Sequence, residues 1–266
     1  MAKRAKYKPY DGDNINLAKF SEALDKLTGK KSAATVFADF LKIAAISISN
    51  FFDPNGKYTP LDVWEEREMT YSRLAEEYGE DFQLFLNMFV ALQSEIDAAK
   101  GVKYRDILGQ FLMGMNFNDE GNDQFFTPNH VAEFMGDLVF ADKDFNSEIA
   151  QRGYCVLREP TCGGGALVFG GVEAFRRQGF DPEQQLLVIA TDLDERCVLM
   201  TYVQCAMYNI PAMVQQCNFT TSESLSPPWF TPKFVFYDWG DKPLTASVGD
   251  TSSAAAKEAF GQITLF

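Results

Sequence analysis

The sequence predicts an α/β protein in which a mostly parallel sheet of about four strands follows a helical N-terminal domain. Apolar residues before position 100 recur at helical spacing. Residues 154–157 form a short apolar run that leads into a glycine-rich turn and a second helical pattern. Residues 186–191 repeat this arrangement of an apolar run before a helix. Strands that alternate with helices in this way form parallel sheets with helices on their faces.

The N-terminal region is expected to be a bundle of helices. Ser32 suits the N-cap of one helix, and Pro60 suits the first turn of a second. A third helix is predicted over residues 82–96, where an apolar stripe is typical of core packing. The polar stretch 116–123 is the best domain boundary, and Pro128 opens the helix that precedes the first strand.

The α/β region begins after this boundary. Its predicted elements are strand 154–158, helix 166–178, strand 186–191, helix 195–208, strand 212–217 and strand 233–238. The predicted domains are a helical domain over 1–120, an α/β domain over 121–243 and a tail over 244–266. Serine and alanine dominate the start of the tail, which indicates a flexible linker.

The most informative segment is the glycine-rich turn at residues 158–165, Arg-Glu-Pro-Thr-Cys-Gly-Gly-Gly. Glycines permit positive φ and a close approach of backbone to a ligand, and a helix N-terminus favours an anionic or polar group. The spacing is not that of the dinucleotide fingerprint. Asp192 follows the second strand, where a doubly wound sheet holds a ribose diol. A nucleoside-type ligand is the working hypothesis, and a tight turn with a surface acid is the alternative.

Three segments resemble the N6-adenine DNA methylases, such as the modification subunits of type I restriction systems. They are residues 124–128 (Gln-Phe-Phe-Thr-Pro), 159–165 and 191–194, and the match covers roughly residues 110–240 in the family's order. The resemblance implies a Rossmann-like sheet that binds S-adenosylmethionine (SAM). The positions that it assigns to this cofactor are Phe126, Thr127, Pro128, Glu159, Pro160, Cys162, Gly163, Gly165, Asp192 and Asn218.

The resemblance also implies a role for each of these positions. The Phe-Thr-Pro segment would flank the methionine end of SAM, and Glu159 would face its amino group. Gly163 and Gly165 would let the backbone approach the cofactor. Asp192 would accept hydrogen bonds from the ribose hydroxyls, and Asn218 sits where the family contacts the adenine ring.

The catalytic motif of this family, [DNS]-P-P-[FYW], ends the fourth strand, and its aromatic ring stacks on a flipped base. Its letters occur at Ser226, Pro227, Pro228 and Trp229. However, the preceding residues 220–224 are polar, unlike a buried parallel strand. A better fourth strand is residues 234–237, which ends at Asp238 and Trp239 without a Pro-Pro pair. Either the motif is displaced or the true site has decayed, and Asp238 is the second catalytic candidate.

Composition limits the function classes. The 266 residues carry a formal net charge of −13, which argues against non-specific nucleic-acid binding through a basic face. Five cysteines without a C-x-x-C pair, together with a single histidine, predict no metal site and suit reduced thiols in a cytoplasm. The longest apolar stretch, residues 40–52, is interrupted by Lys42 and is expected to be too short to cross a membrane.

The last residues carry a separate signal. Gln262, Leu265 and Phe266 resemble the short peptides that bind the bacterial DNA sliding clamp. Docking of such a linear motif orders its tether on binding. The alternative is a hydrophobic tail, or a plug on the surface of this protein.

Two functions are consistent with these features. The first is a SAM-dependent adenine-N6 DNA methyltransferase without a target-recognition domain, acting on DNA as a homo-oligomer or with a specificity partner. The second is a catalytically inactive SAM- or nucleotide-binding partner in a DNA-modification or replication-linked complex. The glycine loop and Asp192 favour the first. The small number of predicted strands and the acidic charge favour the second.

Overall fold

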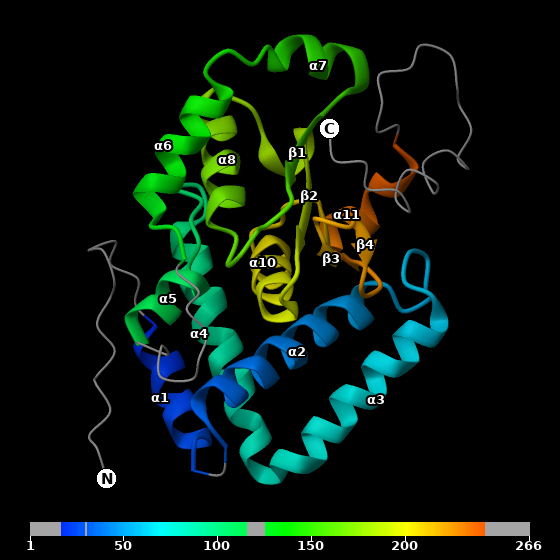
Figure 1. Ribbon diagram of the computed structural model, residues 1–266. Helices are drawn as coiled ribbons and strands as arrows, with labels where there is room; N and C mark the ends of the chain where they lie inside the picture. Colours follow the sequence, from blue (N-terminus) through cyan, green and yellow to red (C-terminus); the bar gives the residue numbers. More distant parts are fainter. Residues whose placement is uncertain (1–16, 30, 116–125, 243–266) are drawn as a thin grey trace.

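The structure is a computed structural model that describes residues 17–29, 31–115 and 126–242 (Figure 1). Its helices are α1 (Ala18–Leu27), α2 (Ala33–Phe52), α3 (Leu61–Tyr78), α4 (Gln83–Ala99), α5 (Leu108–Met115), α6 (Asn129–Phe140), α7 (Phe145–Arg152), α8 (Ala166–Arg177), α9 (Pro182–Gln185), α10 (Glu195–Met207) and α11 (Pro232–Phe236). Ser32 caps α2 by accepting the Thr35 N–H, as predicted. The predicted tail and domain boundary lie outside the described residues.

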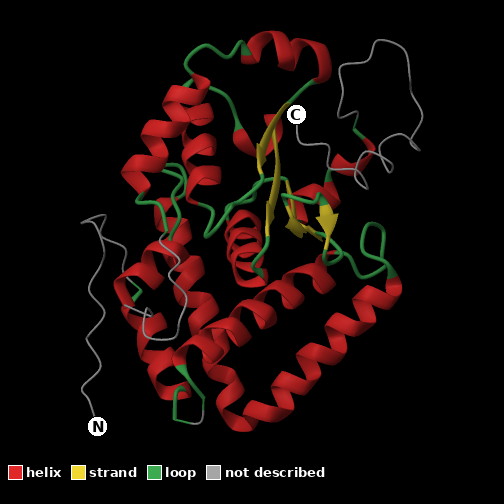
Figure 2. Ribbon diagram, viewed as in Figure 1, coloured by secondary structure: helices red, strands yellow, loops and turns green. Residues whose placement is uncertain are grey.

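A small sheet lies among these helices (Figure 2). Strands β1 (Cys155–Glu159), β2 (Leu186–Asp192) and β3 (Ala212–Asn218) are parallel and neighbour one another in that order. Two short strands, β4 (Glu223–Ser224) and β5 (Trp229–Phe230), pair antiparallel with β3. The prediction of a mixed α/β fold with a mostly parallel sheet is therefore confirmed at this level.

The predicted fourth parallel strand is wrong. Residues 232–236 form the short helix α11, which has Pro232 in its first turn. The fixed φ of proline is already helical there, and its missing N–H needs no partner at that position. Phe234 and Val235 are buried, so the apolar run packs one helical face on the sheet instead of entering it. Asp238 adopts a left-handed φ of 52° just beyond this helix.

Side chains of the sheet alternate between two cores, as the twofold period of a strand requires. Val188, Ala190 and Val214 face the larger core, which also contains residues of α8 and α10. Leu187, Ile189 and Met213 face a smaller cluster with α11 and Trp239. Both faces of the sheet are covered, which explains the apolar run at residues 186–190 in β2 and the apolar start of β3 at residues 212–214.

The N-terminal helices share the larger core with the sheet. Phe40 of α2, Leu92 of α4 and Val203 of α10 belong to one cluster of buried residues.

Among the helices of the described part of the chain, α2 alone is long and apolar enough to cross a membrane. It runs from Ala33 to Phe52 and is therefore longer than the stretch considered from the sequence. In its most apolar window 61% is buried inside the protein, which is typical of a core helix.

Helices α6 and α8 pack closely side by side through glycines (Figure 1). A Cβ atom at Gly136 of α6 would collide with the Gly170 carbonyl of α8, and one at Gly170 would collide with the Ala132 carbonyl. This contact matters for function because the N-terminus of α6 follows Pro128 and that of α8 follows the glycine loop. The two glycines therefore hold the first two predicted site segments beside one another.

Substitution of Gly136 by alanine tests this packing. Alanine is the better helix former by about 1 kcal/mol, yet the collision with the α8 backbone should lower the free energy of unfolding by roughly 1–3 kcal/mol. Urea unfolding measures this change. The matched control is Gly29→Ala, because a Cβ at Gly29 meets nothing within 4 Å, so its effect should stay within about 0.5 kcal/mol. Equal effects at the two positions would contradict the proposed close contact.

Candidate functional site

The strand ends bring the predicted acceptor side chains to one edge of the sheet. Glu159, Asp192 and Asn218 are the last residues of β1, β2 and β3. The carboxyl ends of parallel strands meet at the same edge, where open α/β sheets bind ligands. The structure therefore places these three predicted residues on one side of the molecule.

The glycine loop has a backbone that needs glycine at two positions. Gly163 has a φ of 53° and Gly165 a φ of 101°, and both values lie in the region that side chains disfavour. A Cβ at Gly163 would find only the Phe126 ring within 4 Å, at 3.9 Å. The absent side chain thus leaves a small cradle bordered by Phe126, which the resemblance also assigns to the cofactor.

Asp192 holds the glycine loop as well as ending β2. One carboxylate oxygen accepts the Gly163 N–H at 2.8 Å, and the other accepts the Asp194 N–H at 2.9 Å. Each oxygen of a carboxylate can accept a second hydrogen bond. Asp192 can therefore hold the loop and still accept from a ribose hydroxyl. Asp194, two residues later, caps α10 by accepting the Arg196 N–H.

Other predicted cofactor residues contribute mainly through backbone and packing. The Thr127 carbonyl, just before Pro128, accepts from the Gln110 side chain at 3.0 Å. The Pro160 carbonyl accepts from the Thr191 hydroxyl at 2.9 Å. Cys162 is buried, and burial raises the pKa of its thiol, so the side chain stays neutral. These contacts fix the shape of the loop.

The remaining two predicted residues have local partners. Glu159 is half-buried, and one of its oxygens accepts the Thr161 N–H at 3.1 Å. Asn218 accepts the Thr220 N–H at 3.1 Å and so shapes the turn between β3 and β4. Both stand at the carboxyl edge of the sheet. Their roles toward a cofactor remain predictions.

A buried carboxyl group beneath the glycine loop was missed by sequence reasoning. Asp106 is fully buried, and its Oδ1 accepts from the Gly109 N–H at 2.8 Å and from Gln204 Nε2 at 3.1 Å. Gln204 Nε2 also donates to the Gly164 carbonyl at 2.8 Å. Asp106 Oδ2 has no hydrogen-bond partner. Burial raises the pKa of Asp106 to about 7, so the carboxyl group titrates near neutrality.

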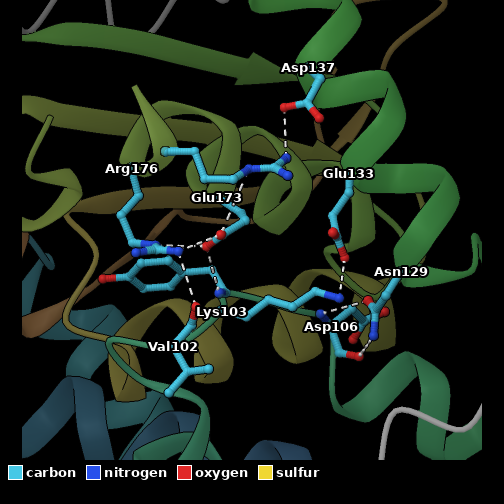
Figure 3. A network of polar contacts seen from close by, with 10 residues as sticks. Val102, Lys103, Asp106, Asn129, Glu133, Asp137, Glu173 and Arg176 are labelled. Atoms are coloured by element: carbon cyan, nitrogen blue, oxygen red, sulfur yellow. Dashed lines mark hydrogen bonds and ion pairs between the residues drawn. The ribbon is translucent and has the colours of Figure 1, made fainter. Parts of the chain in front are cut away.

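The segment that carries Asp106 is attached to α6 and α8 by a network of polar contacts (Figure 3). Asn129 of α6 exchanges two hydrogen bonds with the Asp106 backbone. Lys103 forms an ion pair with Glu133 of α6, and Glu173 of α8 accepts the Tyr104 N–H.

The sequence contains one signal for this buried polar cluster. Gln204 is a polar residue in the middle of an apolar helix, and such residues need buried partners.

The Ser226–Pro227–Pro228–Trp229 segment leads into an antiparallel strand, whereas the family motif ends a parallel strand. Trp229 begins β5 and lies opposite Val214 of β3. Because β5 is antiparallel, the residues before Trp229 lie closer to the carboxyl edge. The Ser226 carbonyl accepts from Gln215 Nε2 at 2.8 Å, and the Ser226 hydroxyl is directed at the Pro227 carbonyl at 3.3 Å. The motif is thus displaced from a parallel strand but not from the edge.

Trp229, one of the two rings against which a flipped base was expected to stack, is covered in this structure. Its side chain is 9% exposed. The Arg67 guanidinium carbon lies 3.5 Å from the centroid of its ring, and the Tyr202 ring lies 5.3 Å away. A base could stack on Trp229 only after one of these neighbours moved.

The prediction that Asp238 and Trp239 end a catalytic strand is also corrected. Trp239 is buried and packs against Tyr154, which precedes the first residue of β1. The glycine loop follows the last residue of β1, and at about 3.3 Å per residue the two positions are roughly 15–20 Å apart. Asp238 forms an ion pair with Lys57 in the loop between α2 and α3. It therefore lies near the opposite end of the strand.

Comparison with known proteins does not identify a family. No protein-family model matches the chain, and no curated protein matches it. In the described ranges, no group of three or more His, Cys, Asp and Glu side chains could hold a metal ion. The geometry of the carboxyl edge is the basis for a functional proposal.

The raised pKa of Asp106 predicts a pH-dependent stability. Between pH 4 and pH 7 the folded protein keeps a proton that the unfolded chain has lost, so the free energy of unfolding should fall as pH rises, by at most about 1.4 kcal/mol per unit. Asp106→Asn removes this titration. The thermal midpoint of the wild type should therefore fall more between pH 5 and pH 8 than that of Asp106→Asn. Parallel pH profiles would show that Asp106 does not titrate in this window.

Proposed function

We propose that this chain is a SAM-dependent adenine-N6 DNA methyltransferase-like protein with a Rossmann-like sheet. The observation that carries the proposal is the meeting of three predicted segments at one edge. The Gly163 N–H lies 2.8 Å from Asp192, and the Phe126 ring borders the open side of Gly163. The segments are distant in sequence, so their assembly is not a consequence of local patterning.

The residues of this edge offer the polar groups that SAM would require. The cradle at Gly163 admits the backbone approach of a ligand, and Asp192 keeps acceptor capacity for a diol. Glu159 provides a carboxylate for an ammonium group at the end of β1. When bound, SAM would supply an activated methyl group for direct transfer.

Ser226 is the residue that we assign to the target amino group. Its hydroxyl is half-buried and stands beside the Pro227 carbonyl, so two oxygens are close together near the carboxyl edge. An amino group that donates to both oxygens would be held in place for transfer. Asp238 lies outside this arrangement.

The acidic charge implies that a partner supplies affinity for DNA. A net charge of −13 opposes binding to phosphate. We therefore keep the proposal that Gln262, Leu265 and Phe266, which lie outside the described residues, bind the sliding clamp. A ring that encircles DNA would raise the effective concentration of the enzyme at its substrate. A homo-oligomer or a specificity subunit would serve the same purpose in the cytoplasm.

A second function is favoured by one observation. Arg67 covers the Trp229 ring, and within the described ranges no parallel strand carries the motif. A protein with these features could bind SAM or a nucleotide without catalysis and act as a partner in a DNA-modification or replication-linked complex. Binding of SAM without methyl transfer to unmodified DNA would support this alternative.

The cofactor proposal predicts saturable SAM binding with a micromolar dissociation constant, or roughly −8 kcal/mol. Asp192→Asn should weaken it by about 1.5–3 kcal/mol, the scale of a hydrogen bond to a charged group. Calorimetric titration measures both values. Asp194→Asn is the matched control, because it removes the same charge two residues away while asparagine still caps a helix well. Equal loss in both variants would indicate a general charge effect and remove Asp192 from the site.

The catalytic proposal predicts different outcomes at the two candidate residues. Ser226→Ala should lower the rate of methyl transfer to adenine by tenfold or more, about 1.4 kcal/mol of transition-state stabilisation. Asp238→Ala should leave the rate within twofold of wild type, because Asp238 lies near the other end of β1. Transfer of labelled methyl groups to unmodified DNA measures these rates. A rate that falls only in Asp238→Ala would reverse the assignment.

A further inference from the structure

Arg67 contacts the predicted base-binding segment in an unusual way. It belongs to α3, and its central guanidinium carbon lies over Trp229, 3.5 Å from the ring centroid. Its Nη2 donates to the Pro228 carbonyl at 3.1 Å, and its Nη1 donates to the Ser49 hydroxyl at 3.0 Å. A planar group with N–H donors therefore occupies the space between α3 and the Ser226–Trp229 segment.

The charge of Arg67 is poorly compensated for such a buried group. Its side chain is 7% exposed, and both of its hydrogen-bond acceptors are neutral. Burial lowers the pKa of Arg67 to about 10, and Tyr202, Glu66 and Asp53 oppose this shift through charge interactions without a hydrogen bond. Burial of a charge without a close partner is costly. Return of the guanidinium to water would recover this cost.

The helix that carries Arg67 is held weakly at this end. The buried residues of α3 are Arg67, Leu74 and Tyr78, so its first three turns bury no large apolar side chain completely. Their other contacts include hydrogen bonds from Asn50 of α2 to Glu68 and to the Trp64 carbonyl. Segments with few buried apolar contacts open locally at low free-energy cost. Displacement of Arg67 therefore need not disturb the main core.

We infer that Arg67 occupies the binding place of a flat, amino-bearing heteroaromatic group, and that the substrate base displaces it. Such a ring would lie over Trp229, where the guanidinium lies now, and turn its amino group toward the Ser226 hydroxyl and the Pro227 carbonyl. A neutral base would occupy this place without the burial of a charge. The inference rests on the proposed function, because it assigns a binding position to the target base of the methyltransferase. It also implies that Arg67 blocks this position while the substrate is absent.

The test uses the full chain labelled with 5-fluorotryptophan and adenosine as the probe. The chain has three tryptophans, so their fluorine resonances can be assigned by single Trp→Phe variants. In Arg67→Met we expect adenosine to shift the Trp229 resonance in a saturable way, with an apparent dissociation constant at least tenfold below that of wild type. The matched control is Arg73→Met, which removes an exposed arginine from the same helix and should behave as wild type.

Each outcome decides the inference. A folded Arg67→Met protein that binds adenosine no more tightly than wild type overturns it. If Arg67→Met does not fold, Arg67→Lys is used, because lysine keeps the charge but cannot stack as a plane, and tighter binding is again expected. Failure of both variants to fold would identify Arg67 as a structural anchor and also overturn the inference.

The same proteins separate this inference from the proposed function. SAM affinity and methyl transfer to unmodified DNA are measured on wild type and on the Arg67 variant. Adenosine binding at Trp229 without methyl transfer would support the binding place and contradict the enzyme. Methyl transfer by wild type, unchanged in Arg67→Met and without a Trp229 shift, would support the enzyme and contradict the role of Arg67.

Discussion

The buried hydrogen bonds between Asp106, Gln204 and the Gly164 carbonyl are the interaction on which the candidate site depends. They join the segment before α5, the middle of α10 and the glycine loop at a single point. Asn129 adds the start of α6 through its bonds to the Asp106 backbone. Because buried polar groups are costly without partners, this cluster determines how four segments meet.

Close packing of α6 on α8 also positions the segments at the carboxyl edge of the sheet. Gly136 and Gly170 allow the backbones of α6 and α8 to touch, so the residues before each helix lie next to one another. The parallel strands deliver Asp192 and Asn218 to the same side. The site is therefore built from the ends of regular elements, which are more rigid than isolated loops. A ligand at this edge would meet an arrangement that is already formed.

The part of the edge that we propose for catalysis is less complete than the part that we propose for the cofactor. The Ser226–Trp229 segment arrives through two short antiparallel strands instead of the end of a long parallel one. Arg67 then closes the segment by stacking on Trp229. The acidic surface adds a second barrier to DNA. Under the proposed function, Arg67 would have to leave Trp229 before a base could stack there.

Sequence patterns alone determined the order of the three parallel strands and of the helices between them, and placed Glu159, Asp192 and Asn218 at the strand ends. Apolar periodicity and the glycine loop are local signals, so β1, β2, β3, α8 and α10 could be placed within two residues of their observed bounds. Local signals failed where long-range packing decides the outcome. The run at residues 234–237 has strand-like composition. It begins instead as a helix at Pro232, and this helix covers the face of the sheet formed by Leu187, Ile189 and Met213. Asp106 and Arg67 gained their roles only from partners far away in the chain, because burial and hydrogen bonding are properties of the folded structure.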